Sequence, residues 1–134
     1  MVCIYCGNKT SVRNSRPSKR TPGVWRRRQC EACQTVFTTR EYADLTEGYA
    51  VQRKDGSLQP FSRDHLFISV YQSCKHRQTA LEDADALTHT ILIKLLSEPK
   101  SDGLITTSAI IAATQEVLAH FDSVAATYYG AYYA

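Results

Sequence analysis

The sequence lacks a long apolar run. Its longest strongly apolar stretch, Ile91–Leu96, is interrupted by Lys94 and falls far short of the roughly 18 residues that a membrane helix needs. Residues 1–7 also lack the basic region followed by an apolar segment that marks a secretory signal peptide. We therefore expect a cytoplasmic protein with no membrane partner, in which thiols stay reduced and structural disulfides are rare.

The motifs of common catalytic sites are missing as well. The sequence contains no glycine-rich phosphate loop of the usual spacing and no Ser/His/Asp or Cys/His arrangement with a supporting motif. The histidines are better interpreted as helix-surface or partly buried side chains than as a catalytic set; they are His65, His76, His89 and His120. We therefore expect a protein that is not an enzyme and has no catalytic residues.

The charge is distributed unevenly along a chain of ordinary composition. Of the 134 residues, 43% are hydrophobic and 22% charged, and the formal net charge is only +3, which excludes collagen-like and disordered chains. Residues 1–40 contain nine basic residues and one acidic residue, a net +8, whereas the remainder has a net −5. This asymmetry indicates a nucleic-acid-binding segment joined to another domain, although charge alone is equally consistent with a solvated basic face.

Four cysteines form two Cys-x-x-Cys pairs in the basic segment. The first motif contains Cys3 and Cys6, the second contains Cys30 and Cys33, and 23 residues separate the two motifs. Two residues between cysteines let a tight turn direct both sulfurs at one ion, and two such turns complete the tetrahedral thiolate shell that Zn²⁺ favours. Because a segment of this size cannot fold on core burial alone, it needs such a cross-link. We predict one structural zinc ion at these four cysteines.

Disulfides, redox chemistry and iron binding are weaker hypotheses for these cysteines. Disulfides or a redox Cys-x-x-Cys motif do not account for two matched pairs in a short segment of a cytoplasmic protein. Iron in a tetrahedral thiolate site stays open, because sequence does not separate the two metals. Cys74 lies in an apolar pattern with Leu66, Phe67 and Val70, which indicates a buried structural thiol and not a fifth ligand.

Short β-strands are predicted around the cysteine pairs. Val24, Trp25 and the β-branched and aromatic residues after Cys33 are typical of strands, with turns at Arg16-Pro17 and Pro22-Gly23. Arginine makes bidentate contacts to phosphates and guanine edges, and hydroxyl groups add neutral hydrogen bonds. The residues expected to contact DNA are Arg13, Arg16, Lys19, Trp25, Arg26, Arg27, Arg28, Thr39 and Arg40.

The acidic remainder is predicted to form a β-hairpin followed by four helices. Residues 49–61 indicate a hairpin that turns at Asp55-Gly56. Apolar spacing predicts helices over residues 63–76 and 79–99, a third that follows residues 106–108 and extends to Phe121, and a fourth from Ser123. The expected caps are Ser62, Thr79 in a capping box with Glu82, and Asp122, and the apolar face of the second helix includes Leu81.

Arg53 and Lys54 lie beside the glycine turn of the predicted hairpin. Their charges and the exposed backbone donors of a turn could bind nucleotide phosphates. An Arg-Lys-Asp-Gly sequence is more commonly a solvated turn. These two residues alone therefore leave nucleotide binding open.

Taken together, the motifs resemble one family: the NrdR-type transcriptional repressors of bacterial ribonucleotide reductase genes, in which a zinc ribbon precedes an ATP-cone domain. The resemblance covers nearly the whole chain. It is carried by Cys3-x-x-Cys6, Asn14-Ser15-Arg16, the run Arg26-Arg27-Arg28-Gln29-Cys30, Cys33, Phe37-Thr38-Thr39, and Val51-Gln52-Arg53-Lys54-Asp55-Gly56 leading to Pro60-Phe61.

The resemblance implies the ligands of each part. Zinc would bind the four cysteines, operator DNA the ribbon arginines, and ATP or dATP the cone as allosteric ligands. By position, the nucleotide contacts would be Val51, Arg53, Lys54 and His65. Nucleotide identity would then change the arrangement of a homo-oligomer, and the dATP-loaded form would repress the reductase genes.

The chain departs from the family pattern at several of these positions. The order Arg53-Lys54 reverses the more usual Lys-Arg, and His65 stands where the family usually has lysine. Near the end, Ala126 replaces a tyrosine and Tyr128 an arginine. The departures concern residues that the resemblance links to phosphate contact and base recognition.

We therefore predict an α+β protein with a small antiparallel β zinc ribbon (residues 1–40), a linker (41–48) and an ATP-cone made of a β-hairpin and a helical bundle (49–134). The predicted function is a repressor that binds double-stranded operator DNA of ribonucleotide reductase genes and senses ATP and dATP through a cone that controls oligomerisation. The alternative is a zinc-ribbon nucleic-acid adaptor whose helical half mediates assembly without nucleotide regulation.

Overall fold

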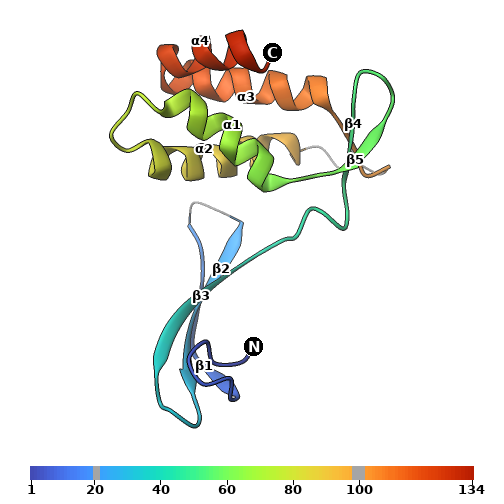
Figure 1. The fold of residues 1–134 in the computed structure, drawn as a ribbon. Coiled ribbons are helices and arrows are strands. Elements are labelled where there is room, and N and C mark those ends of the chain that lie inside the picture. Colours follow the sequence, from blue (N-terminus) through green and yellow to red (C-terminus); the bar gives the residue numbers. More distant parts are fainter. Residues whose placement is uncertain (20–21, 98–101) are drawn as a thin grey trace. The chain divides into compact units, whose positions relative to one another are not determined.

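The chain folds into two structural units. The structure, a computed structural model, describes residues 1–19, 22–97 and 102–134. Its units are Met1–Ala43 and Asp44–Ala134, each with its own strands or helices (Figure 1). An antiparallel sheet in the first unit and a mixed sheet with helices in the second confirm the α+β class. The predicted boundaries of ribbon, linker and cone stay a prediction.

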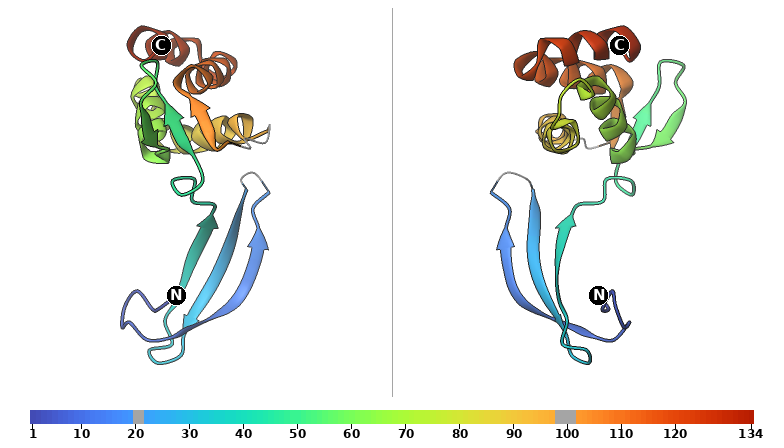
Figure 2. Two further views of the ribbon diagram at one scale, coloured as in Figure 1. Left: turned by 90° about the vertical axis from the view of Figure 1, so that its right-hand side faces the viewer. Right: turned by 60° about the vertical axis from the view of Figure 1, so that its left-hand side comes forward.

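Over the described residues, the first unit is an antiparallel sheet, as expected; it has three strands in the order β1-β2-β3, which the sequence did not predict. Its strands are β1 (Thr10–Pro17), β2 (Gly23–Cys30) and β3 (Val36–Tyr42). Figure 2 shows the strands side by side, with the N-terminal segment curled beside one end of the sheet. A bulge interrupts the pairing of β1 with β2, because Val12 lies opposite Arg28 but Asn14 lies opposite Arg27, which leaves Arg13 as the extra residue.

The sheet buries little apolar surface. Its buried residues are Cys3, Cys30 and Phe37, and the Tyr5 ring packs edge-on against Phe37 with 6.5 Å between ring centroids. Nearly all side chains of β1 are exposed. Burial alone therefore gives this unit a very small core at one end of the sheet.

In its described parts, residues 44–97 and 102–134, the second unit contains three short strands and four helices. They are β4 (Ala50–Gln52), β5 (Leu58–Pro60), α1 (Arg63–Cys74), α2 (Ala80–Leu95), β6 (Leu104–Thr106), α3 (Thr107–Phe121) and α4 (Ser123–Tyr132). The predicted hairpin turn at Asp55-Gly56 is confirmed: Gly56 has φ +84°, and the Arg53 backbone N–H donates to the Ser57 carbonyl at 2.9 Å. The sequence did not predict β6, which pairs in parallel with β4 and gives the sheet order β5-β4-β6.

The helices enclose the main core. α1 packs against α2 and α4, and α3 packs against the same two helices. Val70, Ile91, Leu118 and Ala125 are fully buried between them. Cys74 is fully buried too, as predicted, and desolvation raises the pKa of its thiol to about 11. Within the described ranges, none of the helices is long and apolar enough to span a bilayer.

Two of the expected helix caps are confirmed. The Ser62 side chain accepts the backbone N–H of His65 at 3.2 Å at the start of α1, and the Asp122 carboxylate accepts those of Val124 and Ala125 at the start of α4. The third helix begins earlier than predicted, at Thr107 and not after Ser108, and the Thr106 hydroxyl caps it by accepting the backbone N–H of Ala109 at 3.1 Å. Local capping chemistry therefore sets these three helix starts.

The expectations for the second helix are partly wrong. Thr79 does not cap α2 through its side chain; its hydroxyl donates instead to the Asp83 carboxylate at 2.7 Å, which breaks the proposed capping box with Glu82. Leu81 is 60% exposed and so does not belong to the apolar face. α2 ends at Leu95, and the predicted end at Pro99 lies outside the described residues.

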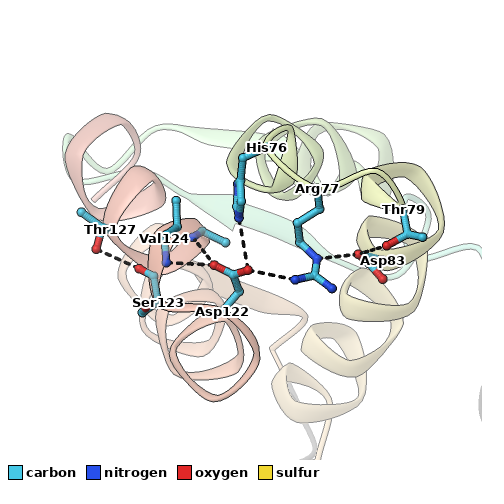
Figure 3. Close-up of polar contacts among 9 residues, drawn as sticks. His76, Arg77, Thr79, Asp83, Asp122, Ser123, Val124 and Thr127 are labelled. Carbon is cyan, nitrogen blue, oxygen red and sulfur yellow. Dashed lines mark hydrogen bonds and ion pairs between the residues drawn. The ribbon is translucent and has the colours of Figure 1, made fainter.

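A polar network joins the turn between α1 and α2 to the start of α4 (Figure 3). Asp122 Oδ2 lies 3.1 Å from His76 Nε2 and accepts from Arg77 Nη1 at 3.0 Å. Arg77 Nε donates to Asp83 Oδ2 at 2.8 Å. The backbone N–H of Ala125, followed by His76, holds the pKa of Asp122 well below its usual range. One carboxylate thus caps α4 and attaches it to the rest of the bundle.

Removing this carboxylate should loosen α4. Asp122→Ala deletes the cap and leaves Arg77 with one carboxylate fewer, so we expect the thermal unfolding midpoint of the second unit to fall by several degrees. Asp122→Asn keeps a capping oxygen and should lose less. Scanning calorimetry measures both, and Glu47→Ala, at an exposed acidic residue, is the matched control.

The pH dependence of the stability of the second unit should also reflect the role of Asp122. The pKa of Asp122 in the folded protein is below its unfolded value of about 3.9. The ionised carboxylate therefore contributes its full stabilisation of the fold at pH values above about 3.9, and this contribution is lost as the pH falls toward the folded pKa. The Asp122→Asn protein should therefore lose less stability than the wild type below about pH 4. An equal loss in both proteins would contradict the role given to Asp122.

Candidate functional site

The four cysteines of the two Cys-x-x-Cys pairs meet at one end of the first sheet. Their Sγ atoms all lie within 4.8 Å of one another. Cys3 Sγ is 3.7 Å from Cys33 Sγ, and Cys6 Sγ is 3.4 Å from Cys30 Sγ. All five cysteines of the chain are free thiols, so the disulfide interpretation is not supported. The spacing therefore brings two pairs, 23 residues apart in sequence, to a single point.

N–H groups donate to three of the four sulfurs, and the thiols share protons unequally. Backbone N–H groups of Tyr5 and Ala32 donate to Cys3 Sγ and Cys30 Sγ, each at 3.4 Å. Asn8 lowers the pKa of Cys6 to about 6, first through its side-chain amide, which donates at 3.3 Å, and then through its backbone. The pKa falls for Cys6 and Cys33, whereas that of Cys30 rises to about 11, because the lowering by the backbone N–H of Cys33 is outweighed by desolvation and the neighbouring thiols. Four convergent sulfurs, three of them with N–H donors behind them, fit the closed tetrahedral shell of a structural zinc site.

The predicted DNA-contacting residues divide between the two faces of the sheet. Residues directly opposite each other on neighbouring strands share a face, and consecutive residues alternate. We call one side the arginine face, formed by Asn14, Arg16, Trp25, Arg27, Thr38 and Arg40. We call the other side the knuckle face, because it carries buried Cys30 at one end; its residues are Ser15, Arg26, Arg28, Phe37, Thr39 and Glu41. The adjacent arginines of the 26–28 run therefore do not form one patch.

Two predicted residues lie outside this division. Arg13 is the extra residue of the β1 bulge, and Lys19 follows the end of β1; both are exposed. Neither is placed by the sheet register on one of the two faces.

The second unit holds a cavity of about 340 Å³ next to the β4–β5 hairpin. Of the predicted nucleotide contacts, Val51 and His65 line this cavity. Arg53 lies just beyond it, because its Nη2 donates to Oε1 of the lining residue Gln59 at 2.6 Å. Lys54 follows in the exposed hairpin turn. The structure therefore brings two of the four residues into the cavity and one into contact with its wall.

Helix starts form part of the cavity wall. Ser62 and His65 belong to the start of α1, and Thr107 and Ile110 belong to the first turn of α3. The Thr107 hydroxyl donates to the Gln52 carbonyl of β4 at 3.2 Å, which fixes the start of α3 beside the sheet. The positive ends of two helix dipoles thus lie near the cavity, a setting that favours anionic groups.

α4 also contributes to the cavity wall, but not through Ala126 and Tyr128, the positions that the family resemblance links to base recognition. Tyr129 and Tyr133, which sequence reasoning missed, line the cavity with their rings stacked at 5.2 Å between centroids. Tyr129 is 3% exposed, and burial raises the pKa of its hydroxyl. Their spacing of four residues places both on one side of α4, which was the one available signal, but it does not show what that side meets.

Comparisons with known proteins match both units. The model of the family described as "Transcriptional repressor NrdR-like, N-terminal domain" matches residues 1–41, and that of the ATP cone domain matches residues 49–132. A protein of Sphingopyxis alaskensis named Transcriptional repressor NrdR is 36% identical over 126 residues, which cover 93% of this chain and 79% of the relative. Its namesake from Streptococcus sanguinis is 34% identical over 92% of this chain and 78% of its own length.

A further protein of the same name, from Symbiobacterium thermophilum, is 37% identical over 91 residues. That alignment covers 68% of this chain and 60% of the length of the relative. The two family matches lie on the unit with the four-cysteine cluster and on the unit with the cavity. The chain therefore belongs to the NrdR family of transcriptional repressors, which are not enzymes and which join a zinc ribbon to an ATP-cone.

Proposed function

We propose that this protein is a nucleotide-sensing repressor that binds operator DNA of ribonucleotide reductase genes in the bacterial cytoplasm. The observation that carries the proposal is the cluster of four thiols at the end of a sheet whose exposed arginines face solvent. This geometry suits a rigid, positively charged module for a polyanion. The domains are assigned as predicted: a DNA-binding ribbon at residues 1–40, a linker at 41–48 and a sensing cone at 49–134.

One zinc ion is proposed at Cys3, Cys6, Cys30 and Cys33. The donor set supports it, because four thiolates within 4.8 Å of one another match the tetrahedral preference of Zn²⁺. When bound, the ion cross-links the N-terminal turn to the turn between β2 and β3. Four thiolates and one Zn²⁺ together carry a charge of −2, so the +8 of residues 1–40 would fall to about +6 and still favour DNA.

The cone is proposed to bind ATP or dATP in the cavity beside the β4–β5 hairpin. A cavity of about 340 Å³ is within the size range of small-molecule sites. Apolar wall residues such as Val51 and Ile110 suit a base and sugar, whereas Arg53, Lys54 and the two helix starts suit phosphates. His65 completes the proposed set at the start of α1 and supplies a cation only when protonated.

Regulation requires a link between the two sites. A nucleotide changes DNA affinity only if it binds the DNA-competent assembly more tightly than the other assembly, and the coupling is reciprocal. We propose that this link is a homo-oligomer whose arrangement depends on the bound nucleotide. In that scheme the dATP-loaded arrangement places ribbons on paired operator boxes and represses the genes.

The zinc site can be tested by removing one ligand. Cys30→Ser should abolish zinc retention and unfold the ribbon, because three thiolates no longer close the shell. Metal analysis measures zinc per chain, and amide NMR spectra report the folding of the ribbon. Cys74→Ala is the matched control, since this thiol lies in the core of the second unit and should leave the zinc in place. A Cys30→Ser protein with one equivalent of metal and full DNA affinity would refute the site, and iron in the wild type would refute zinc.

The phosphate contacts can be tested at the hairpin. Changing Arg53 and Lys54 together to Ala should weaken ATP and dATP binding at least about tenfold, because two charge-assisted contacts are lost. Calorimetric titration measures the affinity, and zinc content confirms that the ribbon is intact. Lys75→Ala removes one exposed cation at the end of α1 and should bind nucleotide like the wild type. Equal affinity in the double variant would move the nucleotide site away from the hairpin.

The sensing function is tested by measuring operator binding and molar mass with ATP, with dATP and with neither. We expect both properties to depend on the nucleotide, with tighter operator binding in the dATP form. Light scattering gives the mass, and fluorescence anisotropy gives the DNA affinity. If DNA binds equally in all three conditions at one molar mass, the simple nucleic-acid adaptor is the correct function.

A further inference from the structure

The arginines of the ribbon are exposed in different ways on its two faces. On the knuckle face, Arg26 Nη1 donates to Ser15 Oγ at 3.1 Å, and its Nη2 lies 3.6 Å from the Glu41 carboxylate. On the same face, Arg28 Nε donates to Thr39 Oγ1 at 3.2 Å. These two guanidinium groups are half-buried and already make contacts within the sheet.

The arginine face has free cations in two rows. One row runs Arg16, Trp25, Arg40 across the three strands, and the next runs Asn14, Arg27, Thr38. Among the described residues, none of the three arginines of this face takes part in an ion pair, and the face as defined holds no acidic residue. All three arginines are exposed. The face therefore concentrates uncompensated positive charge around the Trp25 ring.

The strand spacing relates this face to the dimensions of duplex DNA. The outer strands β1 and β3 lie roughly 10 Å apart, since neighbouring strands are about 4.8 Å apart. This separation is close to the roughly 12 Å width of the major groove. Arg16 and Arg40 on the outer strands can then reach the phosphates that border the groove, while Arg27 on the middle strand lies over the base edges.

We propose that the arginine face is the surface that contacts duplex DNA, with Arg16 and Arg40 on phosphates and Arg27 on a base edge, and that the knuckle face does not touch DNA. This inference rests on the proposed DNA-binding function and deepens it. Asn14 and Thr38, which can donate to phosphates or bases, are added to the expected DNA contacts. Arg26, Arg28 and Thr39, which the sequence predicted to contact DNA, are not expected to touch it.

The chain offers two matched pairs of neighbours for the test, Arg27 against Arg28 and Thr38 against Thr39. The probes are a duplex from the promoter of a ribonucleotide reductase gene of the same bacterium, a scrambled duplex and the single strand of the promoter. Full-length, zinc-loaded protein is titrated by anisotropy over a series of salt concentrations. Zinc content and circular dichroism show that each variant is folded.

The expected results separate the faces. Arg27→Ala should reduce the preference for the promoter duplex about tenfold, while Arg28→Ala changes binding no more than about twofold. Thr38→Ala should weaken binding more than Thr39→Ala. Arg16→Ala and Arg40→Ala should weaken both duplexes alike and each lower the salt slope by about one unit. The single tryptophan, Trp25, lies on the arginine face, so its fluorescence should change when duplex binds.

Different results would overturn the assignment. If Arg28→Ala or Thr39→Ala, with zinc retained, weakens binding as strongly as its neighbour, the face is wrong although the protein still binds DNA. Unchanged Trp25 fluorescence at saturating DNA would overturn it as well. A preference for the single strand would replace duplex binding with base stacking on an aromatic platform. Failure of the wild type to bind any probe would instead refute the proposed function itself.

Discussion

The convergence of four thiols at one end of the ribbon is the constraint on which the rest of the first unit depends. Its buried core otherwise consists of little more than Phe37, and so small a unit cannot be stable on burial alone. A cross-link at the end of the sheet removes the need for an apolar face. Both faces are then free to carry polar side chains, which explains how strands as basic as Arg26-Arg27-Arg28 can form a stable sheet. The metal site thus supplies the stability that allows both faces of the sheet to carry charged side chains.

The second unit is stabilised by apolar burial and not by a cross-link. Its helices bury residues such as Ile91 and Leu118 completely, and no cross-link is needed. As a consequence, the cavity depends on distant parts of the chain: α4 supplies Tyr129 and Tyr133, and Asp122 holds the start of α4 against the α1–α2 turn. A nucleotide in the cavity would therefore contact a helix whose position the polar network also determines. This is a physical route by which ligand binding could alter the outer surface of the bundle.

Local chemistry accounts for the features that the sequence predicted. The paired cysteines, the turn at Gly56 and the caps at Ser62 and Asp122 each depend on residues a few positions apart, and all of these are found as expected. β6 was missed because three residues carry no periodicity and their partner, β4, lies some fifty residues earlier. The aromatic wall of the cavity was missed for a different reason: the spacing of Tyr129 and Tyr133 places both on one side of α4 but does not show which elements that side faces. At Thr79 a local rule failed, since the Asp83 carboxylate competes for the hydroxyl that the capping box required.

The division of the arginines depends on one irregularity that no periodic pattern reveals. If the pairing of Val12 with Arg28 continued without a bulge, Arg13 would lie opposite Arg27, and Arg16 would lie opposite Val24 on the knuckle face. The extra residue at position 13 reverses this and places Arg16 beside Trp25. The inserted residue thus determines which arginine of β1 shares the arginine face with Arg27 and Arg40: Arg16, next to Trp25, and not Arg13. The charge of the segment follows from its composition, but the position of the β1 cation on the face follows from the bulge.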